Sequence, residues 1–335
     1  MNETENKEIA GEAGTSLVVE TYNYREGTSL ESLRNALRVA TSLPAPADGM
    51  EVLLADVTQE PKIAAMLEDE FPSVRRIDAV GLGYDEAKAL AAREARGRYI
   101  VYLDCDCIPE PGWFEKLLAP LVEGRAVASG GFAYYPGGFF TSLYSMMDFG
   151  FLIPHRERHL GCYASNNSAF VRQVLLDIPE PAGPMRCRCY AHAQELARRG
   201  KPVLLAAGAR VRHEPPPFLR ERLRQGYDMV AACWVDPRLP EARLLRYRVA
   251  AAPLFYLKRV RLDWRTLRKH ADELGFGVAG RAIAYPMVAL LRLIDFIGML
   301  AALAMGTSAR RLVDPPPKTS NYSEPESQSL VGVRP

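Results

Sequence analysis

Short apolar runs alternate with helix-like spacing through the first third of the chain. Two strand-like runs, Ser16–Val19 and Met50–Ala55, flank a stretch in which apolar residues recur every three or four positions from Leu30 to Ala40. Such spacing is typical of an amphipathic helix. An alanine-rich helical pattern ends near Arg96, and a third apolar run follows at Ile100–Leu103. This β-α-β-α-β order predicts an α/β fold with a largely parallel sheet and helices on both of its faces.

Polar side chains follow each of these strand-like runs. Glu20 ends the first, Asp56 the second, and Asp104 and Asp106 the third. Ligands of open α/β sheets bind beyond the carboxyl ends of the strands. Two carboxylates one residue apart repel one another unless a cation neutralises them, and Mg²⁺ or Mn²⁺ is commonly held by carboxylates together with substrate phosphates. The pattern favours a divalent cation at Asp104 and Asp106, although an isolated Asp-x-Asp is also found in solvated turns.

A series of motifs over about residues 15 to 220 resembles glycosyltransferase family 2, whose members are inverting, nucleotide-sugar-dependent enzymes. In chain order they are Val18-Val19-Glu20-Thr21-Tyr22-Asn23, the strand ending at Asp56, Gly83-x-x-x-Ala87-Lys88, Gly97 to Trp113 with Asp104 and Asp106, Gly161 to Arg172, and Gly200 to Pro215 with His213. No single motif is specific, but the order is. The resemblance implies a GT-A type, mostly parallel sheet with helices on both faces, followed by a helical C-terminal region.

The resemblance also implies roles for individual side chains. The donor nucleotide would be contacted by Glu20, Thr21, Tyr22, Asp56 (on the base), Lys88 and Asp104. Asp106, with Asp104, would ligate Mg²⁺ or Mn²⁺ on the diphosphate, and Asn166 and Asn167 would lie on the acceptor side. A cation there would act as a Lewis acid for the departing nucleoside diphosphate.

The general base is where the chain departs from the family. Members usually carry an acidic pair before a Leu-rich helix, but Met185 to Gly200 contains no such pair. A base must reach the acceptor hydroxyl and have a suitable pKa. Glu195 and His192 are the local candidates, and each is equally compatible with a structural role on a helix. A base from elsewhere, such as Asp148, and a modified active site are the other possibilities.

Composition and the chain ends narrow the class of protein. Lys and Arg number 42 against 40 Asp and Glu, so no overall positive charge favours nucleic acid. Residues 1–14 are polar, lack a signal-peptide pattern and are expected to be a disordered tail, as are the Pro- and Ser-rich residues 313–335. Six cysteines without an export signal predict reduced thiols and a cytoplasmic protein. Zinc at the two Cys-x-Cys pairs is disfavoured, because zinc motifs usually have two intervening residues.

Residues 221–312 predict a helical, membrane-associating region. Ala282 to Met305 is an apolar stretch of 24 residues, long enough to span a bilayer, but it contains Arg292 and Asp295. Three interpretations remain open: a helix in the membrane interface with both charges facing water, a true span with the charges paired, and a soluble core helix. Many flanking arginines favour contact with an anionic leaflet, and therefore the inner face of the cell membrane.

The sequence thus predicts a glycosyltransferase that moves a sugar, expected to be carried by UDP, onto a glycan or lipid-linked acceptor with inversion, as in polysaccharide biosynthesis. A nucleotidyltransferase would also combine such a sheet with metal-binding carboxylates. No Gly-rich phosphate loop follows the first strand, however, since that strand leads into Thr21-Tyr22-Asn23. A glycosyltransferase-like protein that has lost its chemistry is the alternative suggested by the missing acidic pair.

Overall fold

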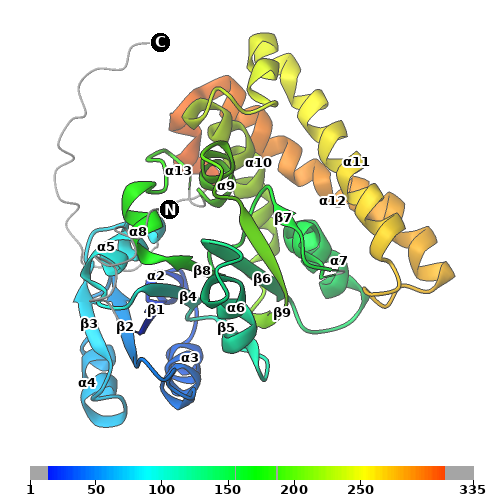
Figure 1. The fold of residues 1–335 in the computed structure, drawn as a ribbon. Coiled ribbons are helices and arrows are strands. Elements are labelled where there is room, and N and C mark those ends of the chain that lie inside the picture. Colours follow the sequence, from blue (N-terminus) through cyan, green and yellow to red (C-terminus); the bar gives the residue numbers. More distant parts are fainter. Residues whose placement is uncertain (1–13, 155, 186–187, 314–335) are drawn as a thin grey trace.

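A computed structural model describes residues 14–154, 156–185 and 188–313 of the 335-residue chain (Figure 1). The two expected tails lie almost entirely outside these residues. The first part alternates strands and helices: β1 Thr15–Glu20, α2 Tyr22–Arg25, α3 Leu30–Ser42, β2 Met50–Asp56, α4 Pro61–Glu70, β3 Arg75–Asp78, α5 Tyr84–Glu94 and β4 Tyr99–Asp104. The second part contains β5 Cys107–Pro109, α6 Trp113–Val122, β6 Ala128–Tyr134, α7 Phe139–Phe149, η2 Gly150–Leu152, β7 His159–Leu160, β8 Asn167–Val171, α8 Arg172–Asp177, α9 Cys189–Arg198 and β9 Val203–His213.

The sheet is parallel at one side and mixed at the other. Its strand order among the described residues is β3-β2-β1-β4-β8-β6-β9-β5, with β7 paired to β9. Strands β1 to β4 are parallel, as the alternation predicts, whereas β8 is antiparallel to both β4 and β6. Strand β6 is parallel to β9. The α/β class with helices on both faces is therefore confirmed, and the reversal begins where the strand-helix alternation of the sequence ends.

Alternate residues of the central strands face two separate apolar cores. On β1, Val18 enters one core, while Leu17 and Val19 enter the other. Helices α5, α7 and α9 cover the first face, and α3, α4 and α6 cover the second. This arrangement follows from the two-residue period of a strand, which sends successive side chains to opposite faces. It leaves the carboxyl ends of β1 and β4 uncovered by the layers.

The C-terminal helices form a third unit packed beside the sheet (Figure 1). They are α10 Phe218–Val235, η3 Ala242–Ala251, α11 Ala252–His270, α12 Val278–Met305, η4 Gly306–Ala309 and α13 Arg310–Val313. Helices α10 and α12 cross at backbone contact. A Cβ atom on Gly226 would lie 1.9 Å from the Asp295 carbonyl oxygen, and one on Gly298 would lie 2.0 Å from that of Leu223. Only glycine fits at either position.

Helix α12 buries two charged residues among apolar ones and leaves other apolar residues exposed. Arg292 and Asp295 are both 0% exposed. Arg292 donates to Asp295 at 2.5 Å, to Asp263 of α11 at 2.6 Å, and to the Met147 carbonyl oxygen of α7 at 2.7 Å. The expectation that Arg292 and Asp295 would face water at a membrane surface is therefore wrong. Partners on α7 and α11, distant in sequence, make burial of the pair possible.

One helical stretch of the described chain, 278–312, is long and apolar enough to cross a bilayer by length and composition. A single stretch of this kind is weak evidence for a span, because core helices of soluble proteins pass the same test. Of the most apolar 18 residues of this stretch, 33% are buried within the protein. With the charged pair turned inward, a span, a helix lying on a membrane and a core helix of the protein consequently all remain predictions.

Gly298→Ala should destabilise the chain strongly, because the added methyl group would separate α12 from α10. We expect a loss of roughly 2–4 kcal/mol in the free energy of unfolding, measured by urea denaturation of the full-length protein. Gly280→Ala on the same helix is the control. Its Cβ would meet Phe139 at an ordinary 3.6 Å, so its better helix propensity should stabilise by up to about 1 kcal/mol. Equal effects of the two substitutions would contradict the backbone contact.

Candidate functional site

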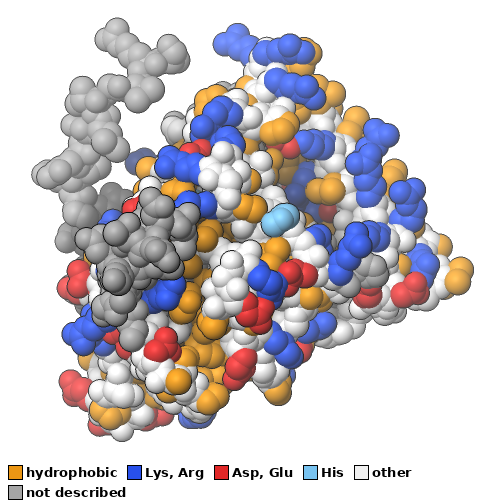
Figure 2. All heavy atoms as spheres, viewed as in Figure 1, with side chains coloured by type: hydrophobic (Ala, Val, Ile, Leu, Met, Phe, Trp, Pro, Cys, Tyr) orange, Lys and Arg blue, Asp and Glu red, His pale blue; other side chains and the backbone are white. Residues whose placement is uncertain are grey.

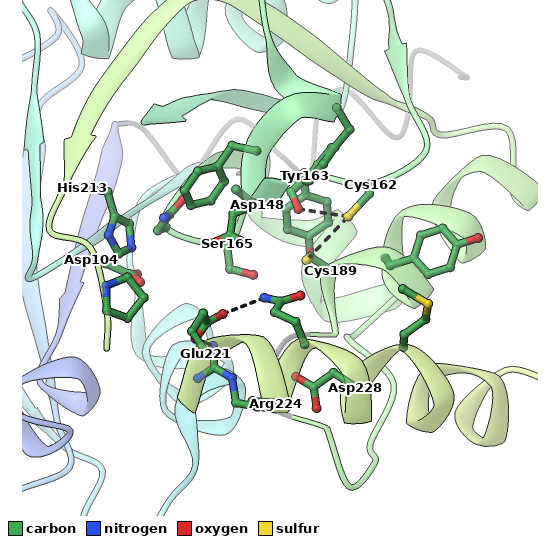
Figure 3. A pocket seen from close by; sticks show the side chains of 18 of the residues that line it. Asp104, Asp148, Cys162, Tyr163, Ser165, Cys189, His213, Glu221, Arg224 and Asp228 are labelled. Carbon is green, nitrogen blue, oxygen red and sulfur yellow. Dashed lines mark hydrogen bonds and ion pairs between the residues drawn. The ribbon is translucent and has the colours of Figure 1, made fainter. Parts of the chain in front are cut away.

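A cavity of about 880 Å³ opens between the carboxyl ends of β1 and β4 and the C-terminal helices (Figure 3). Its polar lining includes Asn23, Tyr84, Asp104, Asp106, Tyr135, Asp148, Arg158, Ser165, Asn166, His213, Glu214, Glu221, Arg224, Gln225, Asp228, Glu241, Lys258 and Arg259. Figure 3 shows Asp104 and His213 at one end, with Cys162 and Cys189 toward the other. The cavity therefore extends from the predicted donor end of the sheet to a part lined by α10 and α11, which includes Arg224 and Arg259 and is called the second chamber below.

Asp104 lies in a buried network at the donor end. Its carboxylate accepts hydrogen bonds from the Lys88 ammonium at 2.5 Å, the Tyr84 hydroxyl at 2.7 Å and the Asn23 amide at 3.0 Å. Burial alone would raise the pKa of Asp104, but the Lys88 charge and these hydrogen bonds outweigh it and lower the pKa. Asp104 is consequently a fixed anion. The structure thus places Lys88 directly beside Asp104.

Glu20 is the neighbour of Asp104 across the β1–β4 pairing. It is fully buried, and one carboxyl oxygen accepts from the Asn23 backbone N–H at 3.1 Å. The other, Oε1, is buried without a hydrogen-bond partner. Burial and then the nearby Asp104 charge raise the pKa of Glu20 to about 8. Glu20 does not line the cavity, so its unpartnered oxygen is a buried polar atom next to Asp104.

Asp106 forms the candidate metal site together with His213, at the end of β9. The Asp106 Oδ1 and His213 Nε2 atoms are 3.6 Å apart, and the Cys107 sulfur lies 3.7 Å from the same oxygen. Burial raises the pKa of the Cys107 thiol well above its ordinary value, so this sulfur is not a ready thiolate ligand. The oxygen of Asp106 fits Mn²⁺ or Mg²⁺, and the imidazole of His213 is a ligand that Mn²⁺ accepts more readily than the oxygen-seeking Mg²⁺.

The sequence did not assign a role to His213, although its segment belongs to the motifs described above. A histidine at the end of a strand carries no information about its ligand partner. The pairing of β5 with β9 sets Cys107 opposite His213 and so brings that histidine to Asp106. This antiparallel contact joins residues about 100 positions apart, which strand alternation alone does not predict.

Asp56 lies outside the cavity lining, as do the predicted donor residues Glu20, Thr21, Tyr22 and Lys88. Asp56 is 0% exposed. Its Oδ1 accepts from the hydroxyls of Thr21 and Thr58, both at 2.8 Å, and its Oδ2 accepts from Arg76 at 2.8 Å. Both carboxylate oxygens are thus occupied within the protein. Asp56 and Thr21 join the loops that follow β1 and β2, and Tyr22 packs edge-on against Tyr84.

The two predicted acceptor-side asparagines differ in environment. Asn166 lines the cavity, and its side-chain oxygen is buried without a partner. Asn167 is fully buried: its oxygen accepts from the Trp113 indole N–H at 2.7 Å, and its amide donates to the Phe132 and Ala209 carbonyls. Asn166 is therefore available to a ligand, whereas Asn167 holds β8 to its neighbours.

Neither local candidate for the general base lines the cavity. His192 is fully buried, with Nδ1 2.7 Å from the Tyr163 hydroxyl and Nε2 2.7 Å from the Ile178 carbonyl oxygen. Burial lowers the pKa of His192. Glu195 makes ion pairs with arginines. The hydrogen bond from Arg199 is the main cause that lowers the pKa of Glu195. The structure does not bring these two residues to Asp104 and Asp106.

Asp148 does line the cavity. It lies near the end of α7, where its Oδ2 accepts from the Tyr135 hydroxyl at 2.8 Å and its Oδ1 contacts Arg222 of α10. The Tyr135 ring is 5.5 Å from the His213 ring, between centroids. Asp148 is therefore on the wall that leads from the candidate metal site toward the second chamber.

Residues 16–178 match the family model described as glycosyl transferase family 2. No curated protein matches the chain. Among solved structures, a mannosyltransferase from Pyrobaculum calidifontis in complex with GDP-Man and Mn²⁺ has a TM-score of 0.55 at 15% identity, over 91% of this chain and 88% of that one.

GalNAc-T7, solved with UDP, GalNAc and Mn²⁺, has a TM-score of 0.48 at 13% identity over 61% of this chain. This chain spans 44% of the length of that structure. The likeness to the mannosyltransferase concerns the fold, and the family match covers the strands that carry Glu20, Asp104 and Asp106. Residues 16–178 therefore match glycosyltransferase family 2, and the fold is of the GT-A type.

Proposed function

We propose that this protein transfers a sugar from a nucleoside diphosphate donor to an acceptor hydroxyl in the cavity, with inversion. The observation that carries the proposal is the position of Asp106 and His213, 3.6 Å apart, beside the Asp104–Lys88 pair at the end of β4. The same cavity continues past Asp148 into the chamber under α10 and α11. Donor and acceptor can therefore meet in one enclosed space.

The donor end has the groups that a nucleoside diphosphate requires. Asp106 and His213 would hold Mn²⁺ or Mg²⁺, which when bound neutralises the charge that develops on the leaving diphosphate. Asp104, fixed by Lys88 and Tyr84, would accept from a donor hydroxyl. We propose a UDP-linked hexose, as the family resemblance implies, with a GDP-linked one as the second choice because the mannosyltransferase was solved with GDP-Man. Release of nucleoside diphosphate from a panel of nucleotide sugars decides between them.

We assign the general base to Asp148. The acceptor oxygen forms its bond to the anomeric carbon as the bond from that carbon to the diphosphate oxygen breaks, and the hydroxyl proton passes to the base. Asp148 is a cavity carboxylate, and its Tyr135 partner packs against His213. Arg222 holds Oδ1 and the Tyr135 hydroxyl donates to Oδ2, so the acceptor hydroxyl would replace Tyr135 at Oδ2 before transfer. This assignment replaces the predicted roles of Glu195 and His192, which lie outside the cavity lining.

We further propose that α11 and α12 rest on the inner face of the cell membrane. Exposed apolar side chains lie along both helices: Leu254, Leu257, Leu262, Trp264, Ile283, Leu290, Leu293 and Ile297. Exposed Arg and Lys side chains accompany them on α11, and Figure 2 shows basic side chains spread over this part of the surface. Apolar side chains beside basic ones favour an anionic membrane surface.

Asp106→Asn should remove metal-dependent nucleotide binding. The amide is neutral and a weaker ligand for a hard cation, so we expect the affinity for UDP or GDP in Mn²⁺ to fall at least about tenfold, or about 1.4 kcal/mol, by calorimetry. Asp272→Asn, at a carboxylate that is 90% exposed, is the control and should bind like the wild type. If Asp106→Asn keeps the full response to Mn²⁺, the metal site lies elsewhere.

Asp148→Asn should lower turnover by about 100-fold or more, because the amide cannot take the acceptor proton. Its donor affinity should change little, and circular dichroism should show an intact fold. Glu221→Gln, at another carboxylate of the same cavity, is the comparison. Loss of turnover in Glu221→Gln with normal turnover in Asp148→Asn would reassign the base, and absence of turnover in the wild type with every donor would favour an inactive protein.

Full-length protein should sediment with vesicles containing phosphatidylserine at low salt, and less so at high salt. Replacing Leu257 and Leu290 by serine should weaken this binding roughly tenfold, because both side chains are more than half exposed on the proposed surface. Val122→Ser, at an exposed residue of α6, should have no effect. A wild-type protein that stays in the supernatant at low salt would refute the membrane proposal.

A further inference from the structure

Buried arginines and aspartates join α7, α10, α11 and α12 beside the cavity. Arg292 donates to Asp263 at 2.6 and 3.1 Å and to Asp295 at 2.5 Å. Arg222 contacts Asp148, and it lies 3.7 Å from Asp295. Each of these three carboxylates thus has an arginine partner. Such pairing offsets much of the free energy that burial of the charges costs.

Arg259, one turn before Asp263 on α11, is a third arginine of this region and is left without a carboxylate. It lines the cavity, and none of the residues that the structure describes makes a hydrogen bond or ion pair with it. Its Nε is buried without a partner. Burial, and then the neighbouring Arg292 charge, lower the pKa of Arg259. A half-buried guanidinium whose Nε lacks a partner gains from an anion that joins it.

The other basic side chains of this chamber already have partners. Lys258 pairs with Glu241, and Arg224 pairs with Glu221. Arg158, which also lines the cavity, donates to the Phe151 and Ile153 carbonyls. Within the described lining, Arg259 is therefore the cation of α10 and α11 that remains available to a ligand.

Arg259 is distant from the donor end of the cavity. Its charge acts on Cys162, where it opposes the burial that raises the pKa of this thiol to about 12. Figure 3 shows Cys162 across the drawn cavity from Asp104 and His213. Phe149, Phe151, Leu160, Met229 and Leu262 supply apolar lining to the same cavity. A ligand here would place one anionic group on the guanidinium and apolar or sugar groups along these walls.

We infer that Arg259 binds a phosphate or diphosphate group carried by the acceptor substrate. This inference rests on the proposed function only in calling the ligand the acceptor substrate. The phosphate-binding site at Arg259 does not depend on it. A guanidinium offers paired N–H donors that match phosphate oxygens, and the bond is charge-assisted. The phosphate is borne either by a lipid, as the apolar lining favours, or by a soluble sugar. Held at Arg259, it would anchor the acceptor while its hydroxyl reaches the donor end.

The test uses full-length protein with EDTA, so that phosphate cannot bind through a divalent cation at Asp106. The probes are farnesyl phosphate, farnesol, glucose 6-phosphate and glucuronate, titrated calorimetrically. Arg259→Gln is compared with Arg261→Gln, an exposed arginine of the same helix. We expect farnesyl phosphate to bind wild type and Arg261→Gln alike and Arg259→Gln at least about tenfold more weakly, or about 1.4 kcal/mol. Farnesol should not distinguish the variants.

Each remaining outcome has a defined meaning. The same loss with glucose 6-phosphate and not with farnesyl phosphate supports an acceptor phosphate on a soluble sugar. Equal binding of both phosphates to Arg259→Gln and Arg261→Gln overturns the inference, as does an Arg259 dependence for glucuronate alone. Should Arg259→Gln misfold, Arg259→Lys keeps the charge but loses the planar fork and should still bind about threefold more weakly.

Failure of the proposed function is separable from failure of this inference. Binding of UDP and GDP with Mn²⁺ is measured on the same preparations and should be equal in wild type and Arg259→Gln, because Arg259 is remote from Asp106. A wild type that binds neither nucleotide refutes the donor site. An Arg259-dependent affinity for phosphate would then still establish the second site.

Discussion

The burial of Arg292 is the interaction on which the arrangement of the molecule depends. Its guanidinium contacts Asp263 of α11, Asp295 of its own helix and the Met147 carbonyl oxygen of α7. A buried arginine that lost any of these partners would be left incompletely compensated, so the contacts act together. They fix the C-terminal helices against the helix that carries Asp148. The cavity exists because these helices are held beside the sheet ends rather than tethered loosely to them.

At the donor end of the cavity, buried carboxylates need compensation by a cation, just as the buried Arg292 needs compensation by carboxylates. Glu20, Asp104 and Asp106 gather at the ends of neighbouring strands, and the Lys88 ammonium compensates Asp104. Burial, and then the neighbouring Asp104 charge, raise the pKa of Glu20 to about 8. The protein thereby keeps Asp104 charged without adding a second cation. A divalent cation would neutralise the negative charge that remains at Asp106.

Sequence patterns predicted the elements whose information is local. The strand ends at Glu20 and Asp104, the helix that carries Lys88 and the helical C-terminal region all followed from periodicity and motif order. The β5–β9 pairing that brings His213 to Asp106 did not, because it joins distant segments. The inward position of Arg292 and Asp295 depends on Asp263 of another helix. Residue type and position near a motif suggested roles for Glu195 and Asp56, but they do not reveal which partners already occupy a side chain, as arginines do at Glu195 and as Thr21 and Arg76 do at Asp56.

The glycine contact between α10 and α12 has a consequence for catalysis at a surface. With Gly226 and Gly298 pressed against the facing backbone, neither helix can roll about its axis or slide without a steric clash. The exposed apolar residues of α12 therefore keep a fixed orientation relative to the cavity. If those residues contact a bilayer, the distance between the reaction centre and the lipid surface is fixed. An acceptor anchored in that bilayer would then need a length that matches this distance.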